Sequence, residues 1–127
     1  MWAAARGHTG KGASTFRNEL AYENDELLGT DPQPKHLKNK YMGTADSGGV
    51  HINSGIPNHA FFLVANELGG RAWERAGLIW YKTLLALNKT SSFKEMVDMS
   101  IQCASGQYGP SSKEAKAVTK AWKAVGF

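Results

Sequence analysis

The chain has one cysteine, Cys103, among its 127 residues. An internal disulfide is therefore excluded, and cysteine usage says little about the compartment in which the protein works. No apolar run approaches the 18 residues that a membrane-spanning helix needs, so we expect no membrane partner. The chain does not begin with a charged and then apolar signal peptide, so secretion would require sequence upstream of Met1.

The chain also lacks the H-E-x-x-H motif, which places two imidazoles on one helix face and a glutamate beside a metal-bound water. Its four histidines are His8, His36, His51 and His59, followed by Thr9, Leu37, Ile52 and Ala60. A catalytic zinc normally has three protein ligands besides water. We therefore expect no metal ligand and no cofactor in this chain alone.

A basic stripe with interleaved aromatic residues, the usual mark of nucleic-acid binding, is missing as well. The net charge of +4 comes from lysines scattered along the chain, so no nucleic-acid partner is expected. The content of 42% apolar and 20% charged residues is ordinary for a soluble globular protein. A chain of this length has room for one domain with a real core.

Helical periodicity dominates the second half of the chain. We expect four helices, over 54–68, over 71–88, from Ser92 to Gly106 or Gly109, and from Ser111 to Gly126. The third and fourth each begin with an expected capping box, Ser92 with Glu95 and Ser111 with Glu114. The apolar face expected for the second helix comprises Trp73, Ala76, Gly77, Trp80, Leu84 and Leu87. These patterns predict a mainly α protein, a bundle of about four to five helices, with a loop-rich segment over 1–45 and one helical domain over 46–127.

One stretch, D-S-G-G-V-H-I-N-S-G-I-P over 46–57, carries the candidate chemistry. Asp46 precedes His51 by five residues, and the two intervening glycines permit a turn that folds the carboxylate onto the imidazole. The carboxylate would fix the tautomer, raise the pKa of His51 and leave the other ring nitrogen free. Ser54 is expected to cap the following helix, with His51 at its mouth. A buried pair that merely closes a loop is the alternative interpretation.

This stretch closely resembles the C-terminal domain of the thermolysin-like neutral zinc metallopeptidases, whose motif is D-N-G-G-V-H-I-N-S-G-I. Ser47 stands where the family usually has asparagine. The resemblance extends more loosely from about Phe16 to the end, and the D-P-Q-P run at 31–34 is similar to bacterial members with short propeptides. It implies that His51 stabilises the oxyanion of peptide hydrolysis and that Asp46 holds it charged and oriented. It also implies zinc, with calcium expected too, in the complete enzyme, and secretion for the family.

A hydrophobic-arginine pair lines a substrate pocket in the resembling family, and Phe16-Arg17 stands at a similar distance before the histidine motif. The resemblance therefore implies substrate binding by Phe16 and Arg17, with the Arg17 guanidinium donating to a substrate carbonyl. A surface arginine in a loop is the alternative for Arg17, because the motif is short and the spacing requires an insertion.

Two functions of different class follow. In the first, the chain is the C-terminal half of a thermolysin-like zinc metalloendopeptidase that cleaves peptides or proteins and is inactive without its H-E-x-x-H half. In the second, it is a stand-alone, non-catalytic domain that binds a peptide or a protein. In the resembling family the missing half covers an apolar face near His51, with Phe61 and Phe62 among the candidates at its edge, so the resemblance implies a weak homodimer of the isolated chain.

Overall fold

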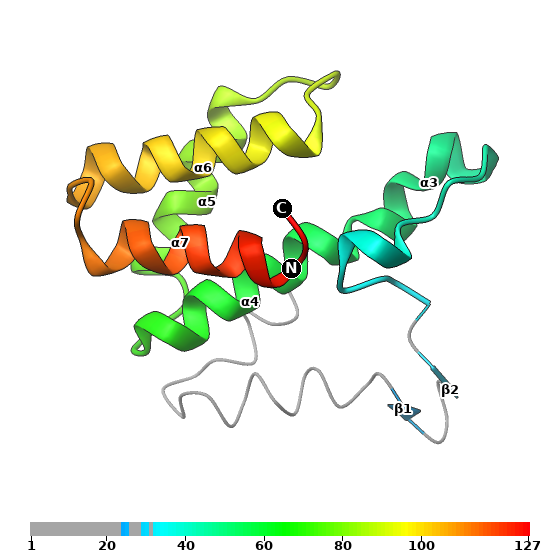
Figure 1. Ribbon diagram of the computed structural model, residues 1–127, viewed down its shortest axis with the longest axis horizontal. Coiled ribbons are helices and arrows are strands. Elements are labelled where there is room, and N and C mark those ends of the chain that lie inside the picture. Colours follow the sequence, from blue (N-terminus) through cyan, green and yellow to red (C-terminus); the bar gives the residue numbers. More distant parts are fainter. Residues whose placement is uncertain (1–23, 26–28, 31) are drawn as a thin grey trace.

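The computed structural model describes residues 24–25, 29–30 and 32–127 (Figure 1). Two short strands, β1 (Asn24–Asp25) and β2 (Gly29–Thr30), pair antiparallel, with Asn24 opposite Thr30. A 3₁₀ helix, η2 (Leu37–Asn39), precedes the α-helices. The α-helices are α3 (Ala45–Asn53), α4 (Gly55–Leu68), α5 (Arg75–Ala86), α6 (Phe93–Tyr108) and α7 (Lys113–Ala124). The predicted class, a mainly α bundle, is confirmed, whereas the division of the chain at residue 45 stays a prediction.

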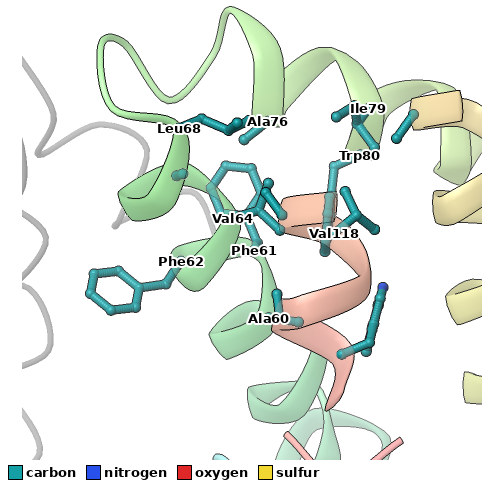
Figure 2. Packing of buried hydrophobic residues seen from close by; sticks show 14 of the residues in the cluster. Ala60, Phe61, Phe62, Val64, Leu68, Ala76, Ile79, Trp80 and Val118 are labelled. Atoms are coloured by element: carbon teal, nitrogen blue, oxygen red, sulfur yellow. The ribbon is translucent and has the colours of Figure 1, made fainter. Parts of the chain in front are cut away.

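The bundle is built from α4, α5, α6 and α7, with α4 packed on α7, α5 on α6, and α6 on α7 (Figure 1). Two tryptophans form its centre: Trp80 of α5 stacks on Trp122 of α7 with ring centroids 5.9 Å apart. Phe61 of α4 meets Trp80 edge-on at 5.5 Å, as the close view of the core shows (Figure 2). The Trp122 indole N–H donates to the fully buried hydroxyl of Ser100 at 2.8 Å, so the polar edge of the ring is satisfied inside the core.

The apolar residues that recur at helical spacing in α4 and near the C-terminal end are largely buried. Ile56, Ala60, Val64 and Leu68 of α4 lie in the core, as do Ala115, Val118, Trp122 and Val125 at the C-terminal end. The expectation that Phe61 and Phe62 lie at the edge of an uncovered face is wrong, since both side chains are buried. Phe61 reaches the core because it packs against Trp80 of α5, a contact between helices that the periodicity of one helix does not specify.

The second helix corrects the prediction in both its start and its face. It begins at Arg75 instead of residue 71, and Trp73 and Leu84 are exposed. The buried face comprises Ala76, Ile79, Trp80 and Thr83. Thr83 can be buried because its hydroxyl donates to the Ile79 carbonyl one turn earlier, at 2.7 Å.

The capping box of Ser92 and Glu95 is confirmed at the start of α6. Gly106 lies inside this helix, which ends at Tyr108 with Gly109 in a positive-φ conformation, so Gly106 does not stop it. The cap of α7 is Ser112 and not Ser111, because the Ser112 hydroxyl accepts from the Ala115 N–H at 3.1 Å. In the described part of the chain, none of the helices has the length and apolar character required to cross a membrane.

A strap, defined here as residues 33–41, runs along one end of the bundle and joins it to α3. The Leu37 N–H donates to the Val125 carbonyl at 2.8 Å, which fastens the middle of the strap to the end of α7. Gln33 and Tyr41, at its two ends, bond to the last turn of α3 and its following residue. The strap therefore ties the segment that carries His51 to the rest of the fold.

Candidate active site

The first half of α3 is wound with the wrong hand for L-residues. Asp46, Ser47, Gly48 and Gly49 have consecutive positive φ angles of 55°, 51°, 85° and 80°. Glycine adopts this conformation freely, whereas a side chain makes it unfavourable and asparagine tolerates it better than most residues. The position of Ser47, where the resembling family usually has asparagine, is therefore one where asparagine fits well. We call residues 46–49 the left-handed turn.

The left-handed turn brings the Asp46 carboxylate onto His51 through two contacts. Asp46 Oδ1 lies 2.6 Å from His51 Nδ1, and the His51 backbone N–H donates to Oδ2 at 2.8 Å. The expected contact between the carboxylate and the imidazole is thus confirmed. The His51 side chain is 87% exposed, against 29% for Asp46, so Nε2 at the opposite edge of the ring is open to an approaching group. The pair is not the buried loop closure of the alternative interpretation.

The contacts set the charges of both groups. The hydrogen bond to Asp46, and then its negative charge, raise the pKa of His51 above its ordinary 6.5. The side-chain and backbone hydrogen bonds from His51 lower the pKa of Asp46 below its ordinary 3.8. The Asp46 contribution to stability is lost as the pH falls through its lowered pKa, and the His51 contribution is lost as the pH rises through its raised pKa. Both contributions are present between about pH 3.8 and 6.5.

Ser54 does not cap α4, which corrects the prediction. Its backbone is right-handed helical and its side chain forms no cap bond. The Ser54 hydroxyl instead donates to the His51 carbonyl at 2.7 Å. Since α3 ends at Asn53 and α4 begins at Gly55, His51 lies in the last turn of α3 rather than at the mouth of α4.

Other candidate residues are distributed differently. Phe16 and Arg17, and with them the expected substrate pocket, lie outside the described residues, as does His8. His59 is half-buried and stacks on Phe62 with ring centroids 5.8 Å apart. Cys103 is half-buried and packs against the core.

The sequence interpretation missed Asn53 and Gln33. The Asn53 side chain is 4% exposed and bonds to Tyr41 and Gly48, while Gln33 Nε2 donates to the His51 carbonyl at 2.7 Å. Asn53 lies in the same 46–57 motif as His51, and its amide side chain was the only sign in the sequence that it could support the motif by hydrogen bonds. Its partner Tyr41 lies 12 residues away, which no local pattern specifies.

The described residues do not fit a zinc site. Over the described ranges, no three histidine, cysteine, aspartate or glutamate side chains lie together as metal ligands. The sequence as a whole contains no H-E-x-x-H. What the arrangement does offer is an oriented imidazole at the surface, whose raised pKa favours its protonated form.

Residues 10–127 match the family described as Thermolysin metallopeptidase, alpha-helical domain, and the chain belongs to this family. It corresponds to the C-terminal helical domain of these peptidases, which confirms the resemblance.

Individual relatives agree with this assignment. The chain is 43% identical over 125 residues to the extracellular metalloprotease of Pectobacterium carotovorum subsp. carotovorum, covering 96% of this chain and 35% of that protein. It is 37% identical over 101 residues to a thermolysin of Alicyclobacillus acidocaldarius, covering 73% and 18%. The solved precursor of protealysin from Serratia proteamaculans is 45% identical, with a TM-score of 0.69 over 81% of this chain and 32% of that one. The chain thus spans about a third of the length of its first relatives.

Proposed function

We propose that this chain supplies the oxyanion-stabilising side of a zinc metalloendopeptidase cleft, with His51 as the donor and Asp46 as the group that holds it. The observation that carries the proposal is the 2.6 Å contact between Asp46 Oδ1 and His51 Nδ1, made by a His51 side chain that is 87% exposed. One nitrogen is engaged and the other is presented outward. A donor fixed in this way costs little reorganisation when charge develops on a substrate.

The chemistry follows from the two protonation states. When a nucleophile adds to a peptide carbonyl, a bond forms to carbon, the C=O π bond breaks and its electron pair moves to oxygen. The His51 imidazolium donates its Nε2–H to this oxyanion, while Asp46 accepts from Nδ1 and balances the positive charge. Removing one such donor costs on the order of 3 kcal/mol, or about a hundredfold or more in rate.

The remaining machinery belongs to the zinc-binding half implied by the family. That half would hold the zinc and the general base, and it is the principal partner that we propose for this chain. Peptides or proteins are the proposed substrates, in keeping with relatives named as extracellular metalloproteases. Arg17 and Phe16 are proposed to line the substrate pocket, and secretion and bound calcium are proposed for the complete enzyme.

Weak self-association through the face that bears His51 is proposed as well. The burial of Phe61 and Phe62 removes the support expected for it, but Met42 and Val50, on either side of the left-handed turn, are 82% and 55% exposed. Sedimentation that gives only monomer at micromolar concentration would contradict this association.

A chimera tests the proposed function. The matching region of the Pectobacterium carotovorum relative is replaced with this chain, so that the rest of the relative supplies the zinc-binding half. We expect the chimera to bind one zinc and to hydrolyse casein in a chelator-sensitive way. The isolated chain should do neither, because it contains no H-E-x-x-H. A folded, zinc-loaded chimera without activity, or a proteolytic isolated chain with tightly bound zinc, would contradict the proposal.

A further inference from the structure

The left-handed turn requires an external support. A left-handed conformation is unfavourable for a residue with a side chain, and Asp46 and Ser47 both adopt it. Such a conformation persists only where the surrounding structure over-determines it. The exposed contact between Asp46 and His51 is weak support, because surface ion pairs contribute little to stability. A buried group that joins the turn to the rest of the fold would add the support that the exposed pair lacks.

Asn53 has the position and the bonds for this task. Its Oδ1 accepts from the Tyr41 N–H at 2.8 Å, and its Nδ2 donates to the Tyr41 carbonyl at 3.0 Å. The same Nδ2 donates to the Gly48 carbonyl of the left-handed turn at 3.4 Å. The side chain is 4% exposed, and a buried amide that uses both ends in this way is costly to disturb. One amide thus joins the strap to the turn.

The Tyr41 ring also packs against the left-handed turn, at Gly49. It packs so closely on Gly49 that an added Cβ would collide with the ring, and that Cβ would also lie 3.1 Å from Asn53 Nδ2. An added Cβ on Gly48, the neighbouring residue, would meet no atom within 4 Å. The close approach therefore exists at one glycine of the turn and not at the other, although their φ angles are 80° and 85°.

We infer that Asn53 is a positioning residue, which clamps the left-handed turn to Tyr41 of the strap and thereby holds Asp46 against His51. The inference rests on the proposed function of the Asp46–His51 pair. It adds a residue that holds the pair in place without touching it. Asn53 contacts neither Asp46 nor His51 through its side-chain bonds, so it acts through the backbone of Gly48.

NMR titration of the isolated chain tests the inference through the pKa of His51. In Asn53→Ala this pKa is expected to fall toward the value found in Asp46→Asn, because the loosened turn no longer holds the carboxylate in place. In the double variant the pKa should fall no further than in Asp46→Asn alone. Asn66→Ala, which removes an exposed amide from α4, is the matched control and should leave the His51 pKa unchanged.

A second pair of variants decides the matter if Asn53→Ala loses its helical circular dichroism. Gly48→Ala and Gly49→Ala impose a similar backbone strain, but only the second drives a methyl group into Tyr41 and Asn53. We expect Gly49→Ala to lower the His51 pKa more than Gly48→Ala does. Equal values in the two glycine variants, or a folded Asn53→Ala with the wild-type pKa, overturn the inference. The proposed function fails separately, through an inactive chimera, so the two outcomes are distinguishable.

Discussion

Replacing His51 with alanine lowers the kcat of the chimera for a peptide substrate about a hundredfold or more, with a smaller change in KM. The physical reason is that the Nε2–H donor meets full negative charge only after the carbonyl has been attacked. The loss of an interaction that is stronger in the transition state than in the ground state lowers kcat. Steady-state kinetics on purified, zinc-loaded chimera measures the effect.

His36→Ala is the matched control for this substitution. His36 caps η2, where its Nδ1 accepts from the Lys38 N–H at 3.1 Å, and it has no part in the proposed chemistry. We expect its kcat to stay within about threefold of the parent, since the change leaves transition-state charge stabilisation intact. Equal kcat losses in the two variants would mean that His51 acts only through folding.

Replacing Trp122 with alanine lowers the free energy of unfolding of the chain by about 3–5 kcal/mol, the usual cost of deleting a core tryptophan. The Trp122 side chain is 1% exposed, stacks on Trp80 and meets the Phe127 ring edge-on at 5.5 Å. Its loss leaves a cavity between α5 and α7 and removes the donor to Ser100. Urea denaturation followed by far-ultraviolet circular dichroism measures the change.

Trp73→Ala controls for the loss of an indole. Trp73 is 50% exposed and lies before α5 with the Arg71 guanidinium 5.7 Å from its ring. We expect its removal to cost about 1 kcal/mol or less, because little of the ring is taken from water. A Trp122 variant no less stable than the Trp73 variant would contradict the packing described for the core.

Helices were predictable where their burial follows a simple period. The apolar residues of α7 repeat every three or four residues and are buried as expected, whereas α4 buries Phe61, Phe62 and Ala65 besides its periodic stripe. The face of α5 was not predictable, because Trp73 and Leu84 look more apolar than Thr83. Thr83 is nevertheless the buried residue, since its hydroxyl finds a carbonyl within its own helix. The periodic pattern depends only on the polarity of each residue type, so it does not predict a hydrogen bond within the helix.

In the candidate site, contacts between residues close in the sequence could be predicted, whereas contacts between distant residues could not. Asp46 and His51 are five residues apart with two glycines between them, so their contact is local and could be predicted. The support from Tyr41 and Gln33 comes across 12 and 18 residues, and it depends on how the strap crosses α3. The left-handed backbone of Asp46 and Ser47 was also not predictable, because neither residue type requires it.

The pH dependence of kcat/KM for the chimera, with and without Asp46→Asn, tests the central claim most directly. His51 must be protonated to donate, so activity falls as the pH rises through its pKa in the free enzyme. Asp46 raises this pKa, and its replacement with asparagine should therefore move the alkaline fall of activity to lower pH. An alkaline limb that stays at the same pH in the Asp46→Asn chimera would contradict the account, because the carboxylate would then not hold the proton on His51.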